Sequence, residues 1–167
     1  VYNTNRMVEE YTEKFYLNSY SKRKSLMESD WKIAKEFSAW RSNLLSKWDS
    51  VRFLKIQDEY KNEELKVGSK LVVNTEVELG GLTPDDVTIQ IYYGKIDDRN
   101  KAHSNQFIEM KYLPKKSNEG KFHYKGEIAC ESSGQFGYTL RILPKHQLLI
   151  NPFELGVIRW ADKDRKS

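Results

Sequence analysis

Apolar and polar residues alternate with a period of two along most of the chain after residue 50. The clearest run lies between Gly134 and His146, where the apolar positions are Phe136, Tyr138, Leu140 and Ile142. A period of two is that of a β-strand with one buried face. Gly134 permits a turn into this run, and Pro144 ends it because proline cannot donate to a sheet ladder. The pattern therefore predicts a central strand over residues 135–143.

Six further segments share this alternation and are separated by turn-forming residues. They are residues 51–56, 71–79, 87–93, 106–113, 121–130 and 156–160. Gly80–Asp86 and Ser117–Gly120 are rich in glycine, proline, aspartate and asparagine, which is typical of turns, and residues 95–105 form the most polar loop. Seven short strands with turns between them indicate a mainly β fold. We predict an immunoglobulin-like or fibronectin-like antiparallel β-sandwich of about seven strands, preceded by two N-terminal α-helices.

Helical periodicity precedes the strands. Residues 5–16 predict a first helix, and residues 22–47 predict a longer one. The apolar stripe of the longer helix comprises Leu26, Ile33, Phe37, Trp40, Leu44 and Trp48. Aromatic residues interleaved with leucine and isoleucine on one helical face are typical of a packed helix, so we expect Trp40 and Trp48 to cover the sandwich. Trp31 lies off this stripe. The predicted organisation is a helical segment over residues 1–49 and a β-sandwich over residues 50–167.

Composition excludes several classes of protein. The 167 residues are 38% hydrophobic and include ten Tyr, seven Phe and four Trp, which argues against disorder. The 28 basic and 24 acidic residues are well mixed, and the basic run at residues 21–24 is too short to indicate nucleic-acid binding. No segment approaches the roughly 18 apolar residues of a membrane helix, so we expect a cytoplasmic protein without a membrane partner. The single cysteine, Cys130, falls on an apolar face and is expected to be buried.

A search for catalytic chemistry is negative. His103, His123 and His146 stand in different contexts and lack the spacing of a metal-binding pair. The pairs Asp85–Asp86 and Asp97–Asp98 lie in loops, where adjacency says little about convergent carboxylates. Phosphate loops, nucleophile elbows and dinucleotide fingerprints do not occur. The sequence therefore predicts no catalytic, cofactor-binding or metal-binding residue.

Motifs near both ends of the chain resemble one enzyme family. The C-terminal motif is Gly137-Tyr138-Thr139, Arg141, Pro144 and His146, followed by Pro152, Glu154-Leu155-Gly156 and Trp160-Ala161. The N-terminal motif is Arg6 to Tyr11 with Phe15-Tyr16. Together they resemble the C-terminal region of α-glucan (glycogen, starch or maltodextrin) phosphorylases of the short bacterial and archaeal type. This resemblance implies a C-terminal piece of such an enzyme.

The resemblance also implies a parent activity that lies outside this chain. Such enzymes release glucose 1-phosphate from α-1,4-glucans with inorganic phosphate, and they hold pyridoxal phosphate on a lysine whose motif has no counterpart here. The piece is then a non-catalytic domain whose partners are the catalytic lobes of the same polypeptide, and self-association into a homo-oligomer stays open.

Two roles for the piece itself remain open. One is a structural or interaction domain, which we favour because three of the four tryptophans have core-like neighbours. The other is a carbohydrate-binding module for α-glucan, with Tyr92 and, more weakly, Tyr112 as the candidate sugar contacts. A sandwich fold serves both roles and does not decide between them.

Overall fold

The computed structural model describes residues 31–58, 70–96, 102–114, 120–129 and 136–161. Within these residues, one α-helix precedes eight strands, so the fold is mainly β as predicted. The helix is α3 (Lys32–Lys47), and a 3-10 turn at Trp48–Ser50 connects it to the first strand. The strands are β1 (Arg52–Asp58), β2 (Lys70–Glu78), β3 (Val87–Ile96), β4 (Ala102–Glu109), β5 (Lys111–Tyr112), β6 (Lys121–Ala129), β7 (Phe136–Pro144) and β8 (Arg159–Trp160).

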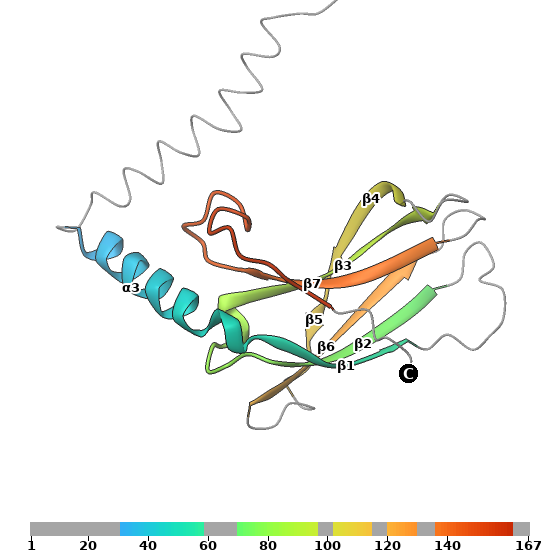
Figure 1. Ribbon diagram of the computed structural model, residues 1–167, viewed down its shortest axis with the longest axis horizontal. Coiled ribbons are helices and arrows are strands. Elements are labelled where there is room, and N and C mark those ends of the chain that lie inside the picture. The colour runs from blue at the N-terminus through green and yellow to red at the C-terminus, as the bar shows by residue number, and fades with distance from the viewer. Residues whose placement is uncertain (1–30, 59–69, 97–101, 115–119, 130–135, 162–167) are drawn as a thin grey trace, which may run out of the picture.

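The strands form two antiparallel sheets that face each other across one core (Figure 1). The first sheet has the order β1-β2-β6-β5, and the second has the order β4-β3-β7-β8. The predicted apolar positions of β2, β3 and β7 point into this core, where Val73, Ile91 and Leu140 are fully buried. The alternation in the sequence thus placed the inner face of each of these strands correctly. We refer to the two sheets and their core as the two-sheet domain.

The strand predicted over residues 106–113 is wrong in one respect, because it is two strands in different sheets. β4 pairs with β3, whereas β5 pairs with β6, and the chain crosses between the sheets at Met110. Met110 is buried, and its N–H donates to the carbonyl oxygen of Ile89 at 2.8 Å. Because the crossing residue faces the same core, the alternation continues through it and hides the change of sheet. The structure therefore has eight strands where the sequence predicted seven.

Other predicted boundaries move, or lie outside the described residues. Residues 102–105, predicted as loop, belong to β4, and the predicted strand over 156–160 shortens to the two residues of β8. The first predicted helix, the beginning of the second, Asp97–Asp98, the basic run at residues 21–24 and Cys130 lie outside the described residues.

Helix α3 contacts the two-sheet domain mainly through its C-terminal turns, and its first turns extend beyond the sheets (Figure 1). Leu44 is fully buried and Trp48 is buried, as predicted from the stripe, whereas Trp40 is only partly buried. Trp31 stands at the start of the helix with a left-handed φ of 62° and is 54% exposed. The sheets therefore cover the C-terminal half of the stripe more completely than its beginning.

Candidate functional site

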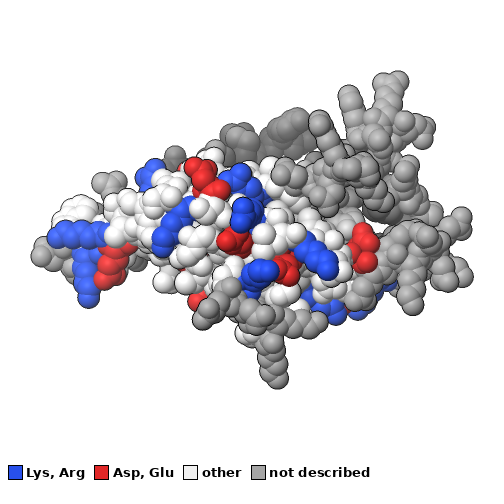
Figure 2. All heavy atoms as spheres, turned by 60° about the horizontal axis from the view of Figure 1, so that its bottom comes forward, with Lys and Arg blue, Asp and Glu red and all other residues white. Residues whose placement is uncertain are grey.

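The outer face of the β1-β2-β6-β5 sheet is an ordinary charged surface. Arg52 pairs with Glu78 at 2.6 Å across β1 and β2, and Lys121 lies 3.5 Å from Glu76 across β2 and β6. Figure 2, which brings the lower side of Figure 1 forward, shows basic and acidic atoms interspersed rather than gathered by sign. Exposed ion pairs of this kind contribute little to stability and indicate a solvated face.

The outer face of the β4-β3-β7-β8 sheet differs, because four aromatic rings surround the guanidinium of Arg141. We call these rings the aromatic cluster. Measured from the guanidinium carbon to each ring centroid, they are Tyr92 at 4.9 Å, Phe153 at 5.3 Å, Phe107 at 5.6 Å and Trp160 at 5.6 Å. Tyr92 also meets Trp160 edge to face, with ring centroids 5.7 Å apart. Each distance lies within the roughly 6 Å range of a cation–π interaction.

Strand register brings these side chains together. Arg141 on β7 lies directly opposite Gln90 on β3 and Trp160 on β8, while Tyr92 lies opposite Phe107 on β4. Residues two apart on a strand share a face, so the two rows are neighbours on the outer side of the sheet. Phe153 completes the cluster from the segment that connects β7 to β8.

Arg141 is held as a buried cation. It is only 8% exposed, and its Nε donates a hydrogen bond to Oε1 of Gln90 at 2.9 Å. Burial lowers the pKa of Arg141 and the neighbouring Tyr92 raises it, but a guanidinium stays charged in proteins. The aromatic ring faces therefore partly replace the water that the cation has lost.

Three of these four rings are also exposed to solvent. Phe107 is 58% exposed, Phe153 is 46% exposed and Trp160 is 42% exposed. Ile150, on the same connecting segment as Phe153, is also exposed. Contiguous exposed apolar groups of this kind mark binding surfaces on soluble proteins. The prediction that three of the four tryptophans are core residues is therefore wrong for Trp160, which contributes to the surface.

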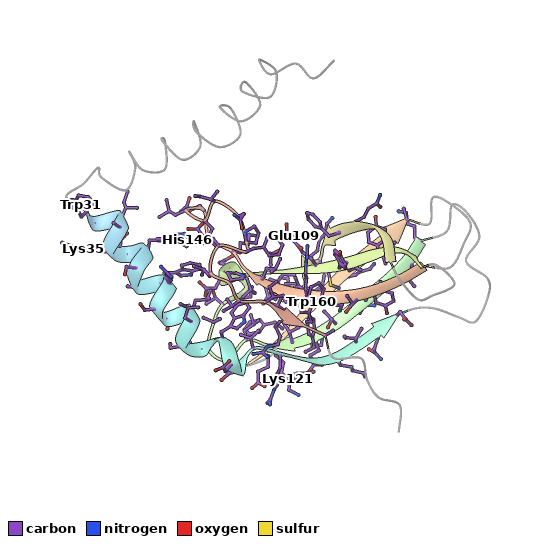
Figure 3. All side chains as sticks on the ribbon, turned by 45° about the horizontal axis from the view of Figure 1, so that its top comes forward. Trp31, Lys35, Glu109, Lys121, His146 and Trp160 are labelled. Carbon is purple, nitrogen blue, oxygen red and sulfur yellow. The ribbon has the colours of Figure 1, made fainter. Side chains whose placement is uncertain are left out.

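A hollow of about 220 Å³ lies beside the aromatic cluster on this face. Its lining comprises Thr88, Gln90, Glu109, Pro144, Lys145, His146, Leu149, Ile150, Asn151 and Pro152. Gln90 thus belongs both to the hollow and to the surroundings of Arg141. Glu109 and Lys145 form an ion pair at 3.3 Å, and Figure 3 shows Glu109 and His146 on either side of this region. Thr88 is buried, and its hydroxyl has no hydrogen-bond partner among the described residues.

His146 also joins the hollow to helix α3. Its ring lies 4.4 Å from that of Trp40 and 5.0 Å from that of Phe37, and its Nδ1 accepts a hydrogen bond from the N–H of Leu148. Trp40 in turn donates from Nε1 to Oδ1 of Asp86 at 2.7 Å. Burial lowers the pKa of His146, while the charge of Asp86 raises it. His146 therefore connects α3 to the segment that follows β7.

The other candidate residues predicted from the sequence lie on different parts of the fold. Tyr92 lies in the aromatic cluster, but Tyr112 is on the other sheet and packs against Phe122 and Tyr124, so the structure does not bring the two candidates together. His123 lies on the outer face of β6, 3.8 Å from Glu76, and His103 belongs to β4 rather than to a loop.

The sequence reasoning missed Phe107, Phe153 and Trp160 as site residues. The sequence did contain a signal for Phe107. This residue stands beside Ile108, and adjacent residues in a strand point to opposite faces, so one of the two apolar side chains had to face outward.

Among the described residues, the outer face of the β4-β3-β7-β8 sheet offers a binding surface. Among them, no three histidine, cysteine, aspartate or glutamate side chains gather as metal ligands would. Within the same residues, no helix is long and apolar enough to cross a membrane. Exposed rings beside a buried cation and a hollow with a mixed polar and apolar lining can hold a ligand.

Comparison with known proteins places this chain beside one enzyme family. The model of the glycogen phosphorylase C-terminal domain matches residues 48–162. A maltodextrin phosphorylase from Thermococcus litoralis is 30% identical over 162 residues, which cover 95% of this chain and 18% of the relative. Glycogen phosphorylases from Mycobacterium bovis and Mycobacterium tuberculosis are 26% identical over 157 residues, which cover 93% of this chain. The chain spans about 18% of the length of these curated relatives.

Proposed function

The chain belongs to the family of glycogen phosphorylase C-terminal domains, and from this premise we propose that it is a non-catalytic part of an α-glucan phosphorylase that docks on the catalytic lobes of the same polypeptide. The parent enzyme would release glucose 1-phosphate from α-1,4-glucans with inorganic phosphate. Its pyridoxal phosphate would be bound outside this segment. We also assign the two-sheet domain to the immunoglobulin-like or fibronectin-like sandwiches, a class that commonly serves in interactions.

Helix α3 is the observation that carries this proposal. Its apolar stripe continues from Phe37, whose ring contacts His146, back to Ile33, which is only partly buried. A helix that displays apolar residues beyond its own domain generally buries them against another surface. In the proposed arrangement, that surface belongs to the catalytic lobes.

Separate expression of this chain and the upstream lobes tests the proposal. The chain alone should release no glucose 1-phosphate from maltodextrin, with or without pyridoxal phosphate, but it should bind the lobes in calorimetry and light scattering. Ile33→Asp should weaken that association, because it places a charge on the stripe. Ser42→Asp is the matched control, since Ser42 is exposed on the opposite side of α3. Phosphorolysis by the chain alone would refute the non-catalytic role. Association that Ile33→Asp leaves intact would refute docking through α3.

A carbohydrate-binding role is the second candidate, and the aromatic cluster favours it. Exposed rings beside polar groups are features of sites that bind ligands with both apolar and polar faces. This role uses the outer face of the β4-β3-β7-β8 sheet, whereas docking uses α3. The two candidates therefore involve different surfaces and can be tested separately.

A further inference from the structure

We propose that the aromatic cluster and the adjoining hollow form one binding site for an α-1,4-glucan segment, with the rings as a stacking platform and the hollow as the part that offers hydrogen-bonding groups. This inference rests on the carbohydrate-binding candidate and is independent of docking through α3. The site is assembled from β3, β4, β7, β8 and the segment between β7 and β8.

The geometry of the rings supports stacking of a sugar. The guanidinium of Arg141 lies over one face of Phe107 and of Phe153. Both residues are about half exposed or more, so part of each ring stays open to solvent beside its contact with Arg141. A pyranose ring has an apolar face of C–H groups that can pack flat on such a ring surface. Arg141 thus fixes the orientation of the platform from below.

The hollow supplies hydrogen-bonding groups beside that platform. Gln90 lies between the two parts of the site, because it accepts a hydrogen bond from Arg141 and also lines the hollow. Thr88 lines the same hollow, and its buried hydroxyl lacks a partner among the described residues. That hydroxyl is closed off from solvent, whereas the exposed Glu109 and Lys145 offer an acceptor and a donor to the hollow. Sugar hydroxyls both donate and accept, so they suit a mixed lining of this kind.

Size and charge favour a neutral ligand. About 220 Å³ is below the roughly 300–1,000 Å³ typical of pockets that enclose a whole drug-sized ligand, so the hollow suits one sugar unit while its neighbours lie across the rings. Glu109 and Lys145 neutralise each other at 3.3 Å, and the charge of Arg141 is covered by rings. Neither an excess of acidic groups for a basic partner nor an exposed basic patch for an acidic partner is found in this lining. A polyhydroxylated, uncharged chain matches the site better than a charged one.

Calorimetric titration of the chain with maltopentaose, beside sedimentation with glycogen, tests the inference. Phe107→Ala should weaken maltopentaose binding about tenfold or more, the loss expected when one stacked ring is removed. Leu54→Ala is the matched control, because Leu54 is a large exposed apolar residue on the other sheet. Cellopentaose, which has β-1,4 links, should bind more weakly than maltopentaose if the platform follows the curvature of an α-1,4 chain. Circular dichroism should show that both variants are folded.

Each remaining outcome refutes a specific statement. No binding of maltopentaose by the folded chain, or equal weakening by Phe107→Ala and Leu54→Ala, overturns the glucan site. A third outcome would assign this face to protein docking instead. In that case the unaltered chain does not bind maltopentaose, and Phe107→Ala no longer associates with the catalytic lobes. Ile33→Asp should leave maltopentaose binding unchanged, so failure of docking through α3 and failure of the glucan site are distinguishable.

Discussion

Asp86→Asn should weaken the contact between helix α3 and the two-sheet domain and so destabilise the fold. The carboxylate of Asp86 accepts from Trp40 Nε1 at 2.7 Å through one oxygen. Its other oxygen accepts from the backbone N–H of Thr83 at 2.8 Å and from the Thr83 hydroxyl at 2.7 Å. An asparagine keeps only one acceptor oxygen, so at least one of these donors must face an amide N–H₂.

The expected loss is about 1–3 kcal/mol in the free energy of unfolding. A hydrogen bond to a charged group contributes about 1.5–3 kcal/mol when buried, and the capping interaction with Thr83 contributes about 1 kcal/mol. Partial exposure of the site reduces both contributions, because solvent screens the charge. The one acceptor oxygen of asparagine would also keep some of the hydrogen bonds that Asp86 accepts. We therefore expect a clear loss that is smaller than the sum of three charged hydrogen bonds.

Urea denaturation followed by tryptophan fluorescence and circular dichroism measures this loss. Asp85→Asn is the control, because it removes the same charge from the adjacent exposed position. The reasoning is refuted if Asp86→Asn lies within about 0.5 kcal/mol of Asp85→Asn, the range of an ordinary surface substitution.

The pH dependence gives a second test with a defined sign. Burial raises the pKa of Asp86, but the hydrogen bonds from Thr83 and Trp40 outweigh it and hold the pKa below its ordinary value. A carboxyl with a lowered folded pKa stabilises the fold above its unfolded pKa of about 3.9, and that contribution is lost as pH falls through the folded value. The difference in the free energy of unfolding between Asp86→Asn and the unaltered chain should therefore be largest at neutral pH and should shrink below about pH 3.9. A difference that stays constant to lower pH would contradict an ionised Asp86.

Three further predictions concern the core and the junction. In urea denaturation, Leu140→Ala should lower the free energy of unfolding by about 2–5 kcal/mol, because Leu140 is fully buried. Tyr138→Phe should lower it by about 1 kcal/mol, because it removes one hydrogen bond to Asp58. Equal losses in the two variants would contradict the assigned burial. Burial lowers the pKa of His146, so the protein should lose stability as pH falls below the unfolded value of about 6.5, and His146→Gln should remove that part of the pH profile. Gly126→Ala should cost about 1–3 kcal/mol by calorimetry, because its Cβ would lie 2.5 Å from Cδ1 of Ile91; a stabilised variant would show that the sheets can separate without cost.

The local sequence pattern was sufficient to predict the inner faces of the strands and the turn between β2 and β3. The alternation at residues 71–79 and 87–93 predicted which side chains enter the core, because the period of two is a property of the extended backbone itself. The glycines and aspartates at residues 80–86 predicted the turn between β2 and β3, where Gly80 and Gly81 adopt positive φ and Asp86 caps the 3-10 turn at Pro84–Asp86. These features depend on residues a few positions apart, so the sequence by itself determined them.

The candidate site depended on tertiary structure. Phe107, Arg141 and Trp160 are far apart in the sequence, and the local pattern of each strand does not show that they belong together. They meet only because β4, β3, β7 and β8 pair in one particular register, and a slip of one residue would send each side chain to the opposite face. The crossing at Met110 is hidden for the same reason, since local periodicity does not reveal which sheet a strand joins. Register and sheet membership are fixed by packing across the whole core, and that packing decided where the aromatic cluster forms.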